Sequence, residues 1–270
     1  MRARVAAALA TAAVLAACAG PEAPPQGTLR VMSLDGCADQ YVLAMAPDAE
    51  LALSPRADDP DSHMRAAARG RTRVRPTLEA AVGFRPDVAV RQWGGDARLV
   101  AALKARGVRV IEIGEADDFD DIRGNVLRVA AELERPQAGV RLVQAMDRDL
   151  AAARAASGQD GGEPALYLTA AGWTTGRGTL VDAVMRAGGL ETAAEAPGYG
   201  PVGLEAAALD PPRRFVLGFF DRSGSDRFGA GRHPVLAEAM RAGRTTELPS
   251  ALIACPAWFT TEAALRLAGG

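Results

Sequence analysis

The chain has 270 residues, of which 49% are hydrophobic and 24% are charged, and its formal net charge is -2. This composition is typical of a globular protein with one large or two modest domains. Because nucleic-acid binding normally needs a basic face, the charge gives no indication of a nucleic-acid partner.

The first residues have the pattern of an export signal. Arg2 and Arg4 precede the apolar run Val5–Leu15, which is too short to span a bilayer as a mature helix. A basic start, an apolar run and small residues beyond it are typical of a secretory signal peptide, which we expect over residues 1–17. The mature protein is therefore expected outside the cytoplasmic membrane, where disulfides persist.

Cys18 follows the small residues of this signal. The pattern resembles a bacterial lipoprotein signal, in which such a cysteine becomes the lipidated first residue; an ordinary signal peptide, cleaved near Ala17 or Ala19, is the alternative. Residues 18–27 are rich in Pro and Gly and are typical of a tether that holds a domain off a membrane surface. We expect a periplasmic protein that contacts the membrane through this lipid anchor alone.

Two cysteines remain, Cys37 and Cys255. An even pair in an oxidising compartment favours a disulfide, although its geometry does not follow from the sequence. Two buried thiols, or a pair of thiols that lines a pocket, are the alternatives.

Strands and helices alternate through residues 28–116, which we take as a first lobe. The expected strands are 28–34, 50–55, 72–76, 87–93 and 108–114, and the expected helices are 37–46, 77–84 and 96–107. Asp35 is a candidate N-cap for the first of these helices. Alternation of this kind predicts a parallel sheet with helices on its faces.

Residues 117–160 show helical periodicity without a strand signal. We expect helices over 118–134 and 136–156, with Pro136 in the first turn of the second helix. A helix of about twenty residues is on the order of 30 Å long, so it would act as a rigid strut. This segment is therefore expected to link two lobes.

Alternation resumes in residues 161–270, the expected second lobe. The expected strands are 165–172, 213–220 and 245–252, and the expected helices are 179–189, 203–210, 233–243 and 260–268. Segment 202–216 repeats the pattern of segment 76–90, with Glu205 and Glu79 at the matching place. The repeat predicts a duplicated architecture, an α/β fold of two Rossmann-like lobes.

Candidate ligand-binding residues come from the ends of the predicted strands, because ligands of parallel α/β sheets bind beyond the carboxyl ends of the strands. The side chains found there are Asp35, Cys37, Arg56, Arg91, Trp93, Trp173, Thr174, Arg177, Arg222 and Trp258. A lining of aromatic and arginine side chains suits a bulky organic ligand with a polar or anionic rim. For any single tryptophan, packing against a loop is the alternative.

The sequence offers little for catalysis. Its only histidines, His63 and His233, lie in separate halves, and no nucleophile-elbow motif is present. The segment GRGT, residues 176–179, lacks the lysine of a phosphate-binding loop. The two histidines with aspartates would make at most a marginal metal site. We therefore expect no enzyme, no cofactor and no resident metal.

The order and spacing of several segments resemble the substrate-binding proteins of ABC importers, in the cluster that binds cobalamin and ferric siderophores. The resemblance covers nearly all of the mature chain. It is carried by SLDGCADQ (33–40), TLEAAVGFRPDVAV (77–90), the long helix, GWTTGRGTLVDAVMRAGG (172–189), YGPVGLEAAALDPPRRFVLG (199–218) and CPAWFTTEA (255–263).

The resemblance implies two α/β lobes joined by one long interdomain helix, with a ligand cleft between the lobes. It also implies a monomeric protein that delivers a metal chelate to a dimeric ABC permease. In this family a glutamate on each lobe docks into the permease, and Glu79 and Glu205 stand at the matching positions. The alternative is that both glutamates are favoured by the dipole at a helix N-terminus.

For the cleft, the resemblance implies two groups of ligand contacts. Four arginines would clamp carboxylates or catecholates of the ligand: Arg56, Arg91, Arg177 and Arg222. Four aromatic side chains would cover a flat face of the ligand: Trp93, Trp173, Tyr199 and Trp258. Cys37 and Cys255 would lie near the cleft, on opposite lobes. The alternatives are a receptor for a bare zinc or manganese ion that uses His63 and His233, and an extracytoplasmic enzyme on the same scaffold.

Overall fold

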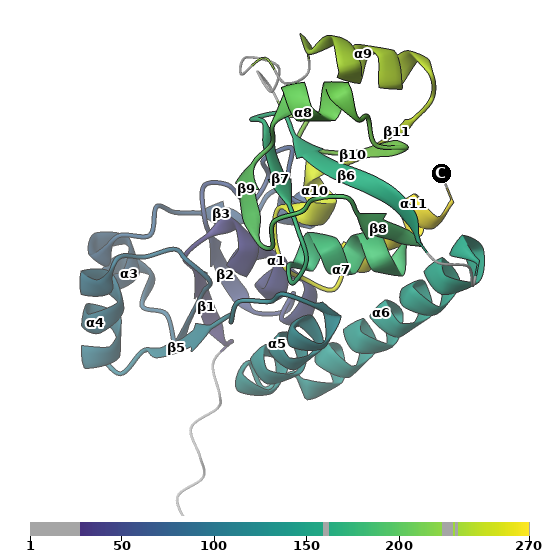
Figure 1. Ribbon diagram of the computed structural model, residues 1–270. Coiled ribbons are helices and arrows are strands. Elements are labelled where there is room, and N and C mark those ends of the chain that lie inside the picture. Colours follow the sequence, from purple (N-terminus) through teal and green to yellow (C-terminus); the bar gives the residue numbers. More distant parts are fainter. Residues whose placement is uncertain (1–27, 159–161, 223–228, 230–231, 270) are drawn as a thin grey trace, which may run out of the picture.

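The chain forms two separate parallel sheets, one in each half of the sequence (Figure 1). The computed structural model describes residues 28–158, 162–222, 229 and 232–269, so the predicted signal peptide, tether and Cys18 lie outside the described residues. In the described ranges, no helix combines the length and apolar character needed to cross a bilayer. The expected α/β architecture of two lobes is confirmed.

The first lobe contains a sheet in the order β3-β2-β1-β4-β5. Its strands are β1 (Arg30–Ser33), β2 (Glu50–Leu53), β3 (Thr72–Arg73), β4 (Val88–Arg91) and β5 (Arg109–Glu112). Its helices are α1 (Gly36–Met45), α2 (Arg65–Ala68), α3 (Leu78–Phe84) and α4 (Ala97–Ala105). All these elements except α2 were expected from the sequence, with bounds that differ by a few residues.

The second lobe contains a sheet in the order β11-β10-β6-β8 and a separate antiparallel hairpin of β7 and β9. The strands are β6 (Glu163–Thr169), β7 (Trp173–Thr175), β8 (Leu190–Thr192), β9 (Tyr199–Pro201), β10 (Arg214–Gly218) and β11 (Thr245–Leu248). The helices are α7 (Leu180–Ala187), α8 (Leu204–Leu209), α9 (Pro234–Arg241), α10 (Ser250–Ile253) and α11 (Thr260–Ala268).

The sequence prediction for this lobe differs from the structure in two ways. The predicted strand 245–252 ends at Leu248, because Pro249 has no N–H for the ladder and α10 begins directly after it. The short strands β7, β8 and β9 were not predicted, since three residues are too few to show an alternating pattern.

The two lobes repeat one topology. The order β2-β1-β4-β5 in the first lobe corresponds to β8-β6-β10-β11 in the second, and all of these pairings are parallel. Helix α3 precedes β4 as α8 precedes β10, which places the two repeated sequence segments at equivalent positions. The duplication inferred from the sequence is therefore present in the topology.

The largest hydrophobic core is shared by both lobes. Val31 and Val90 of the first sheet, and Val216 of the second, belong to one buried cluster that extends into α5, α6 and α11. The alternate residues of the same strands point to the opposite faces, where α3 and α4 cover the first sheet and α8 and α9 cover the second. Each sheet is therefore buried on both faces, as parallel sheets generally are.

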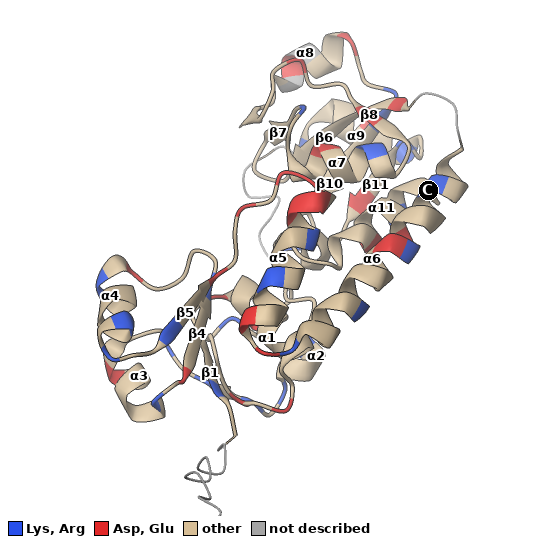
Figure 2. Cartoon of the chain, turned by 90° about the horizontal axis from the view of Figure 1, so that it is seen from below, with Lys and Arg blue, Asp and Glu red and all other residues tan. Residues whose placement is uncertain are grey.

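The connection between the lobes consists of α5 (Phe119–Glu132) and α6 (Pro136–Ser157), which pack against each other. Helix α6 has 22 residues and starts with Pro136 in its first turn, as expected. It contacts α1 of the first lobe and α7 and α11 of the second, and Figure 2 shows it running beside both lobes. The link is therefore a packed pair of helices, not a single helix that stands alone.

Candidate ligand-binding cleft

A cavity of about 540 Å³ lies between the lobes, at the carboxyl ends of β1, β2, β4 and β10. Its apolar lining includes Leu34, Pro55, Pro76 and Trp93 of the first lobe and Phe219 of the second. Its charged lining consists of Asp35, Arg56, Asp61 and Arg222, among the residues that the structure describes. A volume of this size falls in the range that holds a drug-sized organic ligand.

Asp35 links two segments of the cavity wall, the start of α1 and the loop after β4, by hydrogen bonds. One carboxylate oxygen accepts hydrogen bonds from the N–H groups of Cys37 and Ala38 at 3.0 and 2.8 Å, which caps α1. The other oxygen accepts from the N–H groups that follow β4, those of Gln92 at 2.7 Å, Trp93 at 3.2 Å and Gly94 at 2.8 Å. Because both oxygens already accept hydrogen bonds from the backbone, Asp35 positions the cavity wall and is poorly suited to bind a ligand itself.

Gly94 is required where this loop crosses the end of β1. A Cβ atom at this position would lie 2.1 Å from the carbonyl oxygen of Leu34, which no side chain tolerates. Arg91 supports the loop from behind, because its Nε donates to the carbonyl oxygen of Gly94 at 2.7 Å. Trp93 is thus presented at the cavity with 57% of its surface exposed, and its Nε1 donates to Glu115 Oε1 at 2.7 Å.

Asp61 joins arginines from both lobes. Its Oδ2 lies 3.4 Å from Nη2 of Arg56 in the first lobe and 3.0 Å from Nη2 of Arg222 in the second. Arg56 also donates from Nε to Asp59 at 2.9 Å, and this hydrogen bond raises the pKa of the Arg56 guanidinium. The two arginines on the cavity wall are therefore already paired with carboxylates.

A buried polar network lies behind this wall. Asp39 accepts hydrogen bonds from Ser33 Oγ at 2.6 Å and from the N–H and Oγ of Ser54 at 2.9 and 2.5 Å. Burial of the carboxyl, only partly offset by these hydrogen bonds, raises the pKa of Asp39 to about 6. The network ties the end of β1, helix α1 and the end of β2 into one rigid unit.

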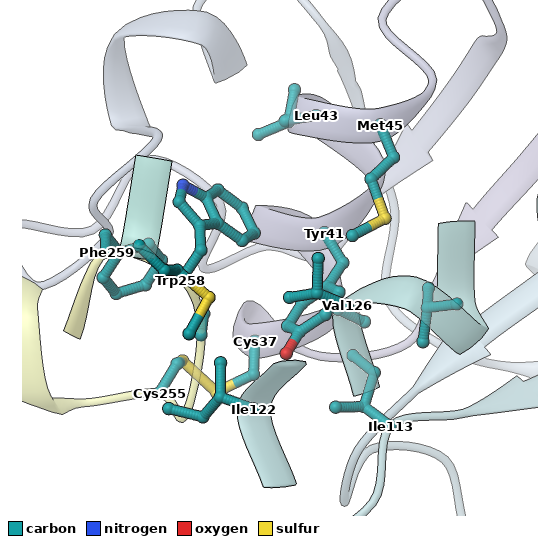
Figure 3. Close-up of a cluster of buried hydrophobic side chains, with 14 of the residues drawn as sticks. Cys37, Tyr41, Leu43, Met45, Ile113, Ile122, Val126, Cys255, Trp258 and Phe259 are labelled. Carbon is teal, nitrogen blue, oxygen red and sulfur yellow. A yellow bond between two sulfur atoms is a disulfide. The ribbon is translucent and has the colours of Figure 1, made fainter. Parts of the chain in front are cut away.

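A disulfide joins the lobes at the cavity. Cys37, in the first turn of α1, is bonded to Cys255 beyond α10, with the Cα atoms 5.4 Å apart. Figure 3 shows this bond beside Tyr41 and Trp258. The hydroxyl of Tyr41 donates to the carbonyl oxygen of Pro256 at 2.9 Å, which adds a second link between the same two segments.

Trp258, which the sequence predicted as a ligand contact, does not line the cavity. Its side chain is only 8% exposed and packs edge-on against the rings of Tyr41 and Phe259, at centroid distances of 5.6 and 5.2 Å. The segment 255–259 is bonded to α1 by the disulfide, and its apolar side chains are buried with those of α1 in the shared core. The ring therefore stabilises the contact between the lobes.

The two histidines also have structural contacts. His63 stacks on Phe259 at a centroid distance of 4.1 Å and lies 3.6 Å from Glu262, and burial lowers the pKa of its imidazole. His233 caps α9, where its Nδ1 accepts from the N–H of Val235 at 3.4 Å. Among the described residues, no three or more His, Cys, Asp or Glu side chains lie close enough to hold a metal ion.

The structure brings together only part of the predicted ligand set. Asp35, Cys37, Arg56, Trp93 and Arg222 line the cavity. The loop residue Asp61 and Phe219, directly after β10, also line it but were missed. Both had a usable signal. The loop of Asp61 follows β2 and is rich in aspartate, and Phe219 lies at the end of the predicted strand 213–220.

The remaining predicted contacts do not line this cavity. Arg91 lies behind the Trp93 loop, and Arg177 forms an ion pair with Glu191 at 3.4 Å on the surface. Trp173, which is 50% exposed, belongs to the hairpin of β7 and β9. Thr174 and Tyr199 of the same hairpin line a separate hollow of about 640 Å³ within the second lobe.

A third hollow, of about 600 Å³, lies between α5, α6 and α7. It is away from the carboxyl ends of both sheets and has many charged residues in its wall, such as Arg123, Arg154 and Arg186. The cavity between the lobes is the better candidate, because it lies at the strand ends and combines an exposed aromatic ring with walls from both lobes.

Comparisons with known proteins agree with this architecture. A family model described as periplasmic binding protein matches residues 41–264. The sequence has no significant match among proteins of curated function. The periplasmic heme-binding protein BhuT, solved with two hemes, is 25% identical with a TM-score of 0.70, and the match covers 90% of this chain and 98% of that one.

Two further solved structures show the same fold. The heme-binding protein RhuT from Roseiflexus sp. RS-1 is 22% identical with a TM-score of 0.70, and the match covers 90% of this chain and 97% of that one. The vitamin B12 binding protein BtuF of Vibrio cholerae is 19% identical with a TM-score of 0.64, with coverage of 88% and 94%. Because the family model covers most of the chain, this protein belongs to the periplasmic binding protein family.

Proposed function

We propose that the protein captures a metal-chelate nutrient outside the cytoplasmic membrane and delivers it to the permease of an ABC importer. The observation that carries this proposal is the cavity of about 540 Å³ whose walls come from both lobes and present the exposed indole of Trp93. BhuT and BtuF, which share the fold, bind heme and vitamin B12, and both ligands are metal chelates of a large macrocycle. Binding, and not catalysis, is the role proposed.

For docking to the permease, we propose Glu79 and Glu205. Both side chains are exposed in the first turn of their helices, α3 and α8. Figure 1 shows these helices toward the outer ends of the two lobes, so a permease dimer would meet one glutamate on each lobe. Charged pairs at such an interface steer encounter and fix the register of the partners.

Attachment to the membrane is proposed through a lipid on Cys18. The mature domain begins its first strand at Arg30, so the Pro- and Gly-rich tether between them would leave the domain free to meet the permease. Metabolic labelling with a radioactive fatty acid, in wild type and Cys18→Ala, tests this attachment. Label that persists in the variant would contradict it.

Binding of a chelate is tested by thermal unfolding with hemin, cyanocobalamin and ferrichrome as probes. A ligand present at 100 times its Kd stabilises the folded state by about 2.7 kcal/mol, so one of these probes should raise the Tm by several degrees. Trp93→Ala should weaken that shift, whereas Trp173→Ala, outside the cavity, is the matched control. A Tm that stays constant with all three chelates, in protein that is folded and oxidised, contradicts the proposal.

The docking role is tested with the double variant Glu79→Arg and Glu205→Arg in vesicles that contain the cognate permease. Uptake should fall by at least about tenfold while the Kd for the chelate stays unchanged, because neither glutamate lines the cavity. Glu238→Arg, an exposed glutamate on α9, is the matched control. A loss of affinity without a loss of uptake per bound ligand would show that the two residues do not dock.

A further inference from the structure

The charged groups of the cavity are compensated within the protein. The Asp35 carboxylate accepts five backbone N–H groups, two from the start of α1 and three from residues 92–94. Arg56 is paired with Asp59 and Asp61, and Arg222 is paired with Asp61. Among the described lining residues, every charge therefore faces a partner of opposite sign or a set of N–H donors.

Asp61 is the central member of this arrangement. Its side chain is 11% exposed, against 60% for Arg56 and 47% for Arg222. Burial of a carboxylate is unfavourable unless cations lie close to it, and here one guanidinium comes from each lobe. The acid therefore occupies the position between the arginines where an anionic group of a ligand would otherwise bind.

The rest of the lining is apolar, with Leu34, Pro55, Pro76, Trp93 and Phe219 around the charged groups. A strongly anionic ligand would find arginines that are already neutralised, and it would be repelled by Asp61 and Asp59. A ligand with a broad apolar face and little net charge would lose less hydration on entry. The lining thus favours the second kind of ligand.

We propose that the cavity selects chelates of low net charge, and that Asp61 sets this selectivity by neutralising Arg56 and Arg222. The proposal rests on the proposed function, since it concerns the cargo of the same cavity. It separates chelates of the cobalamin type from triply anionic ferric tris-catecholates.

The test uses Asp61→Asn, which keeps the size of the side chain and removes its charge. Dissociation constants are measured for cyanocobalamin and for a ferric tris-catecholate. Wild type should prefer cyanocobalamin, and the variant should shift the ratio of the two constants by at least about tenfold toward the anionic chelate. Asp58→Asn, in the same loop but paired with Arg73 and outside the cavity, should leave the ratio unchanged. A wild type that prefers the tris-catecholate, or an unchanged ratio in Asp61→Asn, overturns the proposal.

A second measurement probes the electrostatic charge of the cavity in the absence of ligand, by fluorescence quenching. In a Trp173→Phe background the quenchable fluorescence comes mainly from Trp93, because Trp93 is 57% exposed and Trp258 only 8%. Asp61→Asn should raise quenching by iodide about twofold and leave quenching by neutral acrylamide unchanged, since Arg222 loses its Asp61 counter-ion and Arg56 keeps only Asp59. Equal iodide quenching in both proteins refutes the role of Asp61. A rise in iodide quenching without binding of either chelate, of hemin or of ferrichrome would support that role while contradicting the proposed function.

Discussion

The two lobes share one topology but contribute to the cavity in different ways. In the first lobe, loops at the ends of β1, β2 and β4 form most of the wall, and the carboxylates of the half-buried Asp35 and the buried Asp39 fix them. In the second lobe, the chain after β6 forms the β7–β9 hairpin, and of the residues that the structure describes there only Phe219, Arg222, Ala254 and Cys255 line the cavity.

This difference shows that two lobes with the same strand order can contribute different walls to a binding site. The loops after the strands decide which side chains reach the ligand, and a buried polar network decides whether those loops are rigid. The first lobe supplies a preorganised wall. The second lobe supplies a smaller wall that is fastened to the first by the disulfide and by the contact of Tyr41 with Pro256.

Removal of the disulfide is expected to have the largest effect on this comparison. Cys37 and Cys255 are separated by 218 residues, so the bond strongly restricts the unfolded chain. The double variant Cys37→Ser and Cys255→Ser should lose about 3 to 5 kcal/mol of unfolding free energy. Urea denaturation followed by circular dichroism measures the loss.

Wild type kept in a reducing agent is the control for that variant and should show a similar loss. Hydrogen exchange should also rise in α1 and in residues 254–259, the two segments that the bond joins. A loss below about 1 kcal/mol would mean that the remaining contacts between the lobes suffice without the bond.

Asp39 should make the first-lobe wall sensitive to pH. Burial raises its pKa from 3.8 to about 6, so the folded state binds the proton more tightly than the unfolded state. Its contribution to stability is therefore fully present below pH 3.8 and is lost as the pH rises through about 6. Over this window the free energy of unfolding should fall by about 3 kcal/mol relative to Asp39→Asn, which does not titrate.

This difference is measured by urea denaturation of wild type and Asp39→Asn at a series of pH values between about 3.5 and 7, in steps of about half a pH unit. Because the two proteins share all other titratable groups, the difference between their unfolding free energies cancels the contribution of those groups. A difference that stays flat over the whole range would show that the carboxyl titrates alike in both states.

Asp35 should contribute more than an ordinary helix cap. Asp35→Ala removes the acceptor of five N–H groups and should cost about 2 kcal/mol, whereas Asp96→Ala, which caps α4 through the N–H of Leu99, should cost about 1 kcal/mol. Trp93 fluorescence should change only in the first variant. Equal losses in both variants would mean that the anchoring of residues 92–94 adds nothing to stability.

Much of the fold follows from the sequence, because it depends on local patterns. Alternating strands and helices predicted both sheets, Pro136 marked the start of α6, and the repeat around Glu79 and Glu205 indicated the duplication. Asp35 was foreseen as a cap, but its second oxygen bonds to residues 57 to 59 positions away, which no local pattern reveals.

The cleft depended on contacts between distant segments. The sequence placed Trp93 and Trp258 at strand ends alike, yet one ring is exposed at the cavity and the other is buried in the shared core. Likewise, the sequence left the pairing of the two cysteines and of the arginines open. In the folded protein the cysteines form a disulfide, and Arg222 pairs with Asp61. Local sequence sets the elements through hydrogen bonding and periodic burial, but which side chains meet across two lobes depends on how the whole core packs.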